Sequence, residues 1–193
     1  RRYVLRVEKR NGKGFQIENA EQSLAVEEAL NRNPLVVSDY RTKESSRSPL
    51  PPFKTSQLQQ EASRRLGFSP RRTMGIAQSL YEGIDIPGRG PVGLITYMRT
   101  DSLRISPEAI DSSRRYIQET MGNTYLPEKP NHYMPNEKAQ DAHEAIRATD
   151  PFLTPASLKG YLNPEQFRLY ELIWNRFIAS QMAPARMART TIE

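Results

Sequence analysis

The chain of 193 residues contains no cysteine, which excludes disulfide bonds and thiolate metal sites. It has only two histidines, His132 and His143, so a histidine-built metal site is disfavoured. No apolar run approaches the length of a membrane span, and no signal-peptide pattern precedes the first expected strand. The mean hydropathy of −0.71 is typical of a polar globular protein. We therefore expect one sizeable domain or two small ones, with no membrane partner.

Positive charge is in moderate excess. Lysine and arginine number 28 against 22 acidic residues, a net charge of +6 that fits a polyanionic partner without establishing one. The arginines gather between residues 64 and 147, as Arg64-Arg65, Arg71-Arg72, Arg114-Arg115, Arg89, Arg99, Arg104 and Arg147. A single pair is usually a solvated helix face, so a phosphate-binding surface and solvated faces both remain open.

The order of expected elements predicts an α+β fold. Strands are expected over 3–9 and 15–17, around the turn at 11–14, then a helix over 20–31 and a strand from 35 toward 47. The proline-rich run 48–52 predicts a domain boundary or hinge, and 122–142 reads as a long surface loop. Residues 186–193 look extended and could pair with the early strands, which would make the helical region an insertion in a β-containing domain.

The middle of the chain is mainly helical. Ser56 with Gln59 has the capping-box pattern and would open a helix that ends at Gly67. Further helices are expected after Ser69-Pro70, Ser106-Pro107, Thr154-Pro155 and Asn163-Pro164. The last has a broad apolar face that predicts core: Phe167, Tyr170, Ile173, Trp174, Phe177 and Ile178. The first two helices form a helix-turn-helix-like pair, for which an ordinary helical hairpin in a core is the favoured explanation over a DNA-reading motif.

The run Gly93–Ser102 carries the strongest chemical signal. An apolar, strand-like segment leads to Tyr97, and Arg99 follows two residues later. On a strand, residues two apart share a face, so a phenol and a guanidinium would point to the same place. A phenol is a usable nucleophile and a guanidinium binds phosphate oxygens bidentately. The pair therefore suggests attack on a phosphodiester, although an isolated Tyr-x-Arg is usually packing plus a solvated charge.

A second informative run spans residues 142–147, Ala-His-Glu-Ala-Ile-Arg. On a helix or turn, His143 and Arg147 lie four apart and share a face, where they would make a compact phosphate clamp. The alternative is that His143 packs locally while Arg147 pairs with Glu144.

Together these runs resemble type IA DNA topoisomerases. That family carries Thr-Tyr-x-Arg-Thr-Asp-Ser at its active site, with His-Glu-Ala-Ile-Arg-Pro downstream in the same order. Met98 at the variable position is similar to the bacterial topoisomerase I branch, and Ala148 replaces the usual proline. The resemblance extends over nearly the whole chain, through the runs at 51–56, 58–62, 67–69, 76–78, 80–82 and 169–174.

The resemblance implies a division into domains and a set of roles. Residues 1–50 and 184–193 would belong to the second, arch-forming domain, and residues 53–183 to the third, helical domain that carries the tyrosine. Tyr97 would be the nucleophile, and Arg99 would bind the scissile phosphate and favour the phenolate, whose unperturbed pKa is about 10. The remaining implied roles are DNA binding by His143, Arg147, Thr100 and Ser102, and structural support by Asp101 and Glu144.

In such enzymes the tyrosine joins the 5′ phosphate of a single strand, another strand passes through the gap, and the free 3′ hydroxyl reverses the ester without ATP. The resemblance thus implies relaxation of negatively supercoiled DNA, in the cytoplasm and at the nucleoid. The family's Mg²⁺ site belongs to a toprim domain, whose Asp-x-Asp-x-Glu cluster this sequence does not contain, and Glu27-Glu28 read as solvated. We expect no cofactor in this chain, a magnesium-dependent partner domain elsewhere in the same polypeptide, and strand binding without cleavage by the isolated chain.

Two other interpretations remain. Tyrosine recombinases and type IB topoisomerases also use tyrosine, histidine and arginine, but their tyrosine follows a His-x-x-Arg box, whereas Tyr97 precedes His143 here. The second is a noncatalytic single-stranded-DNA-binding module in which Tyr97 only stacks on a base.

Overall fold

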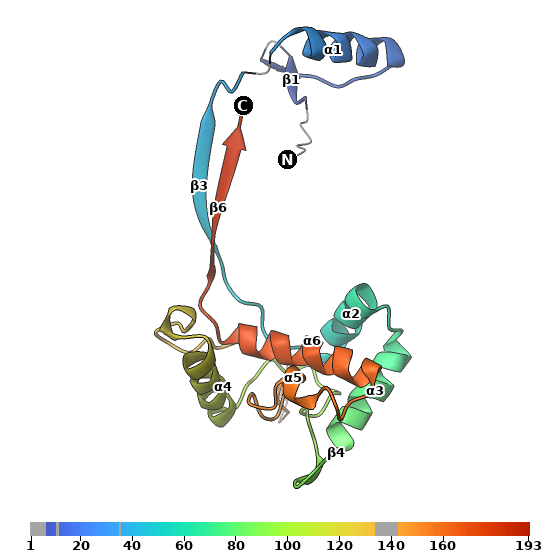
Figure 1. Cartoon of the computed structure of the whole chain (residues 1–193), viewed down its shortest axis with the longest axis vertical. Coiled ribbons are helices and arrows are strands. Elements are labelled where there is room, and N and C mark those ends of the chain that lie inside the picture. The colour runs from blue at the N-terminus through green and yellow to red at the C-terminus, as the bar shows by residue number, and fades with distance from the viewer. Residues whose placement is uncertain (1–6, 11, 35, 134–142) are drawn as a thin grey trace. The chain divides into compact units, whose positions relative to one another are not determined.

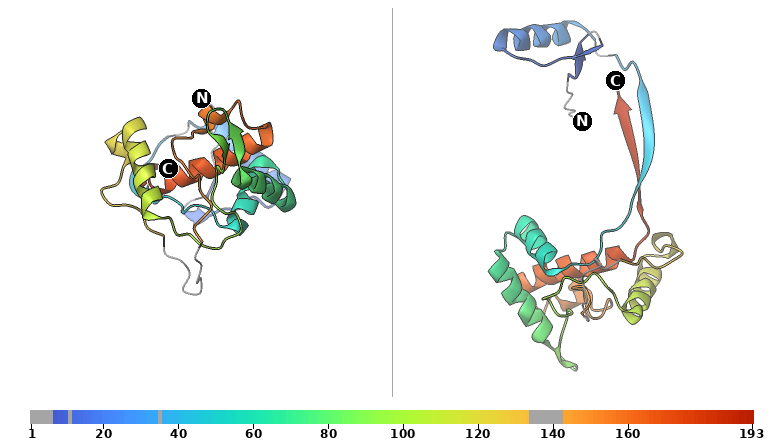
Figure 2. Two further views of the ribbon diagram at one scale, coloured as in Figure 1. Left: turned by 90° about the horizontal axis from the view of Figure 1, so that it is seen from below. Right: turned by 180° about the vertical axis from the view of Figure 1, so that it is seen from behind.

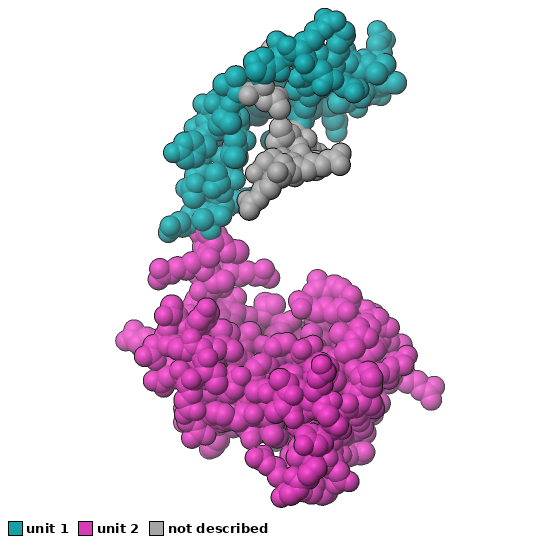
Figure 3. Space-filling view, viewed as in Figure 1, with its two compact units in different colours: residues 1–44, 188–193 teal, residues 45–187 magenta. Residues whose placement is uncertain are grey.

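The computed structural model describes residues 7–10, 12–34, 36–133 and 143–193 of the chain. It divides into two compact units (Figure 3): unit 1 comprises Arg1–Glu44 and Ala188–Glu193, and unit 2 comprises Ser45–Met187. The expected assignment of residues to second and third domains of a topoisomerase stays a prediction. Each unit is described by itself below.

Unit 1 holds a short hairpin and one helix. Strand β1 (Lys9–Arg10) pairs antiparallel with β2 (Lys13–Gly14), and α1 spans Ala20–Arg32. The helix was expected, and the side chain of Asn19 caps it by accepting a hydrogen bond from the Gln22 backbone N–H. The strand expected over 15–17 is wrong: β2 ends at Gly14, and beyond it only the Phe15 N–H still bonds across the hairpin, to the Glu8 carbonyl at 3.1 Å. The first residues of the strand expected over 3–9 lie outside the described part.

The expected pairing of the strands from the two ends of the chain is confirmed. β3 (Tyr40–Arg47) and β6 (Ala185–Ile192) form a two-stranded sheet. At its end the Glu193 backbone N–H donates to the Asp39 carbonyl at 2.9 Å. The strand expected from residue 35 therefore begins only at Tyr40; Leu35 itself lies outside the described residues.

Unit 2 is mainly helical. Its elements are α2 (Thr55–Leu66), α3 (Pro70–Glu82), β4 (Ile84–Ile86), β5 (Gly90–Val92), α4 (Pro107–Thr120), the short 3-10 helix η1 (Asn123–Tyr125), α5 (Pro155–Leu158) and α6 (Pro164–Ser180). Helix α6 crosses the unit, with α2 and α3 toward one of its ends and α4 toward the other (Figures 1 and 2).

The helix starts of unit 2 follow local chemistry. Four helices begin with proline at the first turn after a Ser, Thr or Asn whose side chain accepts a backbone N–H: α3 after Ser69, α4 after Ser106, α5 after Thr154 and α6 after Asn163. These four starts were expected and are confirmed. The expected capping box of Ser56 and Gln59 is wrong, because α2 is capped two residues earlier: the Gln57 side chain accepts from the Lys54 N–H at 3.4 Å.

Helix α6 organises the core. The apolar face expected for it is buried, except that Phe167 is half-buried. Its Trp174 ring meets Tyr116 of α4 edge-on at 5.4 Å between centroids, and α2, α3 and α5 all contact α6. The helices α2 and α3 also pack on each other, with Leu58 and Leu80 fully buried, as both a helical hairpin and a helix-turn-helix would.

Candidate functional site

The two sequence runs that suggested chemistry lie side by side in unit 2. The Thr96 N–H donates to the Arg147 carbonyl at 3.0 Å, and the Thr149 N–H donates to the Leu94 carbonyl at 3.0 Å. An isolated antiparallel bridge joins Ile95 to Ala148. Segments about fifty residues apart in sequence are thereby held together. The expected regular strand through Tyr97 is wrong: apart from this bridge the segment is irregular, and it bends after Tyr97.

Gly93 sets the start of the tyrosine segment against α3. A Cβ atom at residue 93 would lie 2.8 Å from the carbonyl oxygen of Tyr81, closer than side chains tolerate. The next N–H, of Leu94, donates to the Leu80 carbonyl at 2.8 Å. Glycine thus allows the segment to pass directly over the last turn of α3.

Tyr97 stands at the surface between two other rings. It is 37% exposed. The ring of Tyr81, from the last turn of α3, meets it edge-on at 5.5 Å between centroids, and the ring of His143 lies on it at 5.5 Å with a tilt of 34°. The structure thus brings His143, an expected DNA contact, against Tyr97. Sequence reasoning missed the contact of Tyr81 with Tyr97.

Thr55 braces the turn that follows Tyr97. Its hydroxyl donates toward the Met98 carbonyl at 2.8 Å and the Thr100 carbonyl at 3.1 Å, and accepts from the Thr100 N–H at 2.9 Å. The backbone N–H of Thr55 also donates to the Thr100 carbonyl at 2.9 Å. With Met98 fully buried beneath it, the turn leaves Tyr97 and Arg99 facing out. The side chains of Tyr97, Met98 and Arg99 thus alternate between outward and inward as expected of a strand, although hydrogen bonds from Thr55 hold them and not a sheet.

Thr100 and Ser102, expected as DNA contacts, are buried. They are 5% and 2% exposed. The Thr100 hydroxyl accepts from the Ser102 N–H at 3.0 Å, and the Ser102 hydroxyl accepts from the Arg104 N–H at 3.2 Å. These hydroxyls therefore shape the loop that carries Tyr97 and Arg99, and the geometry gives Ser102 no outward contact.

Arg99 and Asp101 are both exposed. They line one open pocket together with Thr55, Ser56, Gln59, Met74, Thr100 and His143, with a volume of about 580 Å³. Within the described ranges neither side chain forms an ion pair, and the structural role expected for Asp101 stays a prediction. Sequence reasoning missed the part that Gln59 and Met74 have in this pocket.

Arg147 does not share an outward clamp with His143. It is 9% exposed, and its Nε and Nη2 donate to the Glu144 carboxylate at 2.8 and 2.5 Å. Its Nη1 donates to the Ala148 carbonyl at 3.0 Å, and its guanidinium lies over the ring of Phe177. The segment is neither helical nor a regular turn, so the four-residue spacing does not bring the two side chains to one face. The alternative pairing of Arg147 with Glu144 is the one observed.

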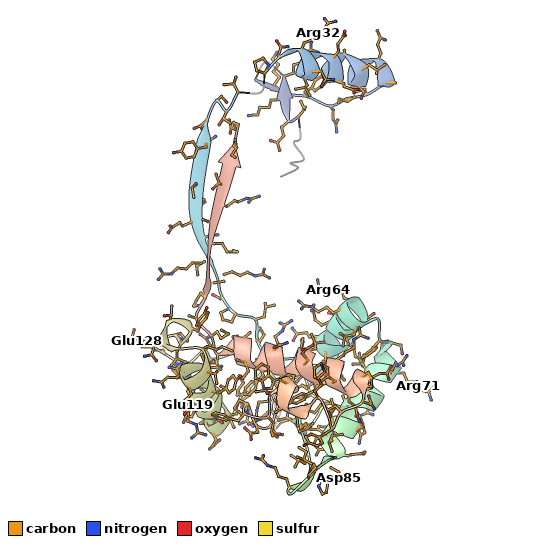
Figure 4. The ribbon with its side chains drawn as sticks, in the orientation of Figure 1. Arg32, Arg64, Arg71, Asp85, Glu119 and Glu128 are labelled. Atoms are coloured by element: carbon orange, nitrogen blue, oxygen red, sulfur yellow. The ribbon has the colours of Figure 1, made fainter. Side chains whose placement is uncertain are left out.

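Several arginines on the helices are neutralised locally. Glu61 binds Arg64 at 2.6 Å and Arg65 at 2.8 Å, and the hydrogen bond from Arg64 is the main reason that the pKa of Glu61 is lowered. Arg72 pairs with Glu165. Arg71, which projects from α3 in Figure 4, has no such partner among the described residues. Arg64, Arg65 and Arg72 are thus exposed side chains that each pair with a carboxylate, and the expected phosphate-binding surface stays a prediction.

Neither a metal centre nor a membrane span is found in the described ranges. No three His, Asp or Glu side chains there gather as metal ligands. No described helix combines the length and apolar character needed to cross a membrane.

Comparison with known proteins identifies the chain. Residues 4–193 match the family model described as DNA topoisomerase, so the chain belongs to the DNA topoisomerase family. Similar relatives are bacterial. The DNA topoisomerase 1 of Xylella fastidiosa is 44% identical over 98% of this chain and 24% of its own length. That of Campylobacter jejuni is 48% identical over 88% of this chain and 24% of its own length.

A solved structure agrees in fold. The full-length topoisomerase I from Thermotoga maritima matches with a TM-score of 0.74 and 42% sequence identity, over 95% of this chain and 28% of that one. The chain thus spans about a quarter of the length of the relatives it matches. The resemblance to bacterial topoisomerase I inferred from the two sequence runs is confirmed.

Proposed function

We propose that this chain is the tyrosine-bearing part of a type IA topoisomerase that relaxes negatively supercoiled DNA by cutting and resealing one strand. The observation that carries the proposal is Tyr97, held at the surface between Tyr81 and His143 on the same loop as an outward Arg99. Membership of the DNA topoisomerase family makes DNA the natural substrate. The detail of single-strand cleavage is what the resemblance of the two sequence runs to type IA topoisomerases implies.

The reaction would proceed by transfer of one phosphodiester bond. The Tyr97 phenol oxygen, having given up its proton, attacks the phosphorus of a single strand and forms an ester with the 5′ phosphate. The 3′ oxygen leaves and takes up a proton. After strand passage the 3′ hydroxyl attacks the ester and restores the phenol, so the bond energy is conserved and ATP is not needed.

Arg99 and His143 are the outward groups beside Tyr97 that could hold the strand. A guanidinium forks onto phosphate oxygens, and its fixed charge would stabilise the extra negative charge of the transition state. The imidazole of His143 lies against the Tyr97 ring and also lines the Arg99 pocket, which puts it between nucleophile and phosphate site.

We assign the other residues expected to contact DNA a structural role in holding the tyrosine segment. Arg147 is bonded to Glu144 and to the Ala148 carbonyl, and the backbone of Arg147 holds Thr96, the residue before Tyr97. We assign Arg147 and Glu144 the role of positioning the tyrosine segment. The buried Thr100 and Ser102 would position Arg99 through their hydrogen bonds within the loop.

Magnesium would act from outside the described residues. Of the carboxylates near Tyr97, Glu144 is bonded to Arg147, and no cluster with metal-binding geometry surrounds the site in the described ranges. The proposed holder is a toprim domain elsewhere in the polypeptide, and the isolated chain would bind single strands without cleaving them. The enzyme would work in the cytoplasm at the nucleoid.

A noncatalytic single-strand-binding module is the second candidate. The exposed rings of Tyr81, Tyr97 and His143 form a row on which unpaired bases could stack. In that case the Tyr97 hydroxyl would be dispensable.

Covalent trapping tests the proposal. The chain is combined with the rest of a bacterial topoisomerase I, a labelled single-stranded oligonucleotide and Mg²⁺, then quenched with denaturant. We expect a labelled protein adduct that Tyr97→Phe abolishes and the matched variant Tyr81→Phe retains, because only Tyr97 supplies the attacking oxygen. Strand binding without any adduct, unchanged by Tyr97→Phe, would establish the binding module instead.

A further inference from the structure

The pocket beside Arg99 collects polar side chains that the described fold does not use. Ser56 and Gln59 come from α2, and Arg99 and Asp101 from the loop after Tyr97. Within the described residues these four side chains make no hydrogen bond or ion pair. A pocket on which a few polar groups converge is a candidate ligand site.

The register of α2 frees Gln59 for this role. Because Gln57 caps the helix, the amide of Gln59 falls one half-turn further along and faces the pocket. The side chain is half-buried, so its position is restrained by its surroundings. An amide offers one acceptor and two donors, the combination that reads a base edge in pairs of hydrogen bonds.

The remaining lining fits a nucleotide. The cavity of about 580 Å³ falls within the range of small-ligand sites, roughly 300–1,000 Å³. Arg99 supplies a phosphate contact and Met74 of α3 an adaptable apolar surface for a base. When it is ionised, the Asp101 carboxylate can accept hydrogen bonds but cannot donate them. It therefore favours a base with an exocyclic amino group. Adenine, cytosine and guanine have that group, and thymine does not.

We propose that this pocket holds the nucleotide next to the cleaved bond, and that Gln59 and Asp101 select a base that carries an amino group. The inference rests on the proposed function for its link to cleavage, and on the pocket alone for nucleotide binding. It makes Gln59 a specificity-determining residue. The phosphate that Arg99 binds would then be fixed by contacts to the base as well as by charge.

Nucleotide titration of the chain tests the pocket without any cleavage step. Deoxynucleoside 5′-monophosphates are added while the side-chain amide resonances of the chain are followed by NMR. We expect dAMP, dCMP and dGMP to shift the Gln59 amide at concentrations several-fold lower than dTMP. Gln59→Ala should remove this preference, whereas Gln60→Ala, on the exposed neighbour, should keep it. Equal response to all four nucleotides, or none at Gln59, would overturn the inference.

Cleavage-site mapping then separates this inference from the proposed function. In the reconstituted enzyme, Gln59→Ala should flatten the distribution of cleaved sequences, while Asp101→Asn should raise cleavage beside thymine. An unchanged distribution refutes base selection by the pocket while adduct formation still stands. If only Tyr97→Phe loses the adduct and both pocket variants cleave the same sequences as the parent, Tyr97 is the nucleophile. Base selection by Gln59 and Asp101 is then refuted.

Discussion

The hydroxyl of Thr55 should matter to stability far more than its small size suggests. Thr55→Val keeps the shape but removes the donor to the Met98 carbonyl and the acceptor of the Thr100 N–H. Both groups belong to residues that are at most 5% exposed. A buried polar group left without a partner costs about 1–3 kcal/mol. Since the bond from the Thr55 N–H to the Thr100 carbonyl survives, we expect a loss of about 2–4 kcal/mol for the two groups together.

Urea unfolding followed by the fluorescence of the single tryptophan measures this loss. Thr55→Ser retains the hydroxyl and should lose about 1 kcal/mol or less, the cost of one methyl group. Thr124→Val, on an exposed threonine with no hydrogen bond recorded in the described ranges, should change stability by less than about 0.5 kcal/mol. If the valine and serine variants at residue 55 unfold with the same free energy, the hydroxyl does not brace the turn and the reasoning fails.

Two other perturbations have expected outcomes. Gly93→Ala would place a methyl group 2.8 Å from the Tyr81 carbonyl oxygen and should destabilise the chain by about 1–3 kcal/mol. The control Gly75→Ala, in a helix with open space around it, should stabilise the chain by about 0.5–1 kcal/mol. Equal shifts of the melting temperature in the two variants would contradict the close approach of Gly93 to Tyr81. The pKa of Glu61 is lowered from 4.5 chiefly by the Arg64 hydrogen bond, so its contribution to stability is present above pH 4.5 and is lost as the pH falls through the lower folded-state value. Glu61→Gln should therefore differ from the parent in unfolding free energy at pH 7, and the difference should shrink as the pH falls below 4.5. A difference that stays constant as the pH is lowered through the acid range would argue against the pair.

Features decided by neighbours in sequence were predicted well. The helix starts at Ser69, Ser106, Thr154 and Asn163 were readable because a capping side chain and a following proline act within one turn. The start of α2 was placed wrongly, since two candidate glutamines lie two residues apart and only the fold selects Gln57.

Features decided by distant partners were predicted less well. Tyr97 was expected on a strand, yet its segment is held by isolated backbone hydrogen bonds to Arg147 and Thr149. An alternation of apolar and polar residues in the sequence does not reveal such bonds. The spacing of His143 and Arg147 suggested a shared helical face, but the segment is irregular and Glu144 draws the guanidinium inward. Nothing local to the run at 51–56 indicated that Thr55 would clamp the turn after Tyr97.

The central claim is that one particular tyrosine of nine carries the DNA. The most direct test is to digest the trapped adduct with protease and nuclease and to locate the remaining nucleotide by mass spectrometry. The account predicts a nucleotide on the peptide that contains Tyr97, joined through its 5′ phosphate. A nucleotide on Tyr81, whose ring lies 5.5 Å away, or on any other tyrosine would contradict it.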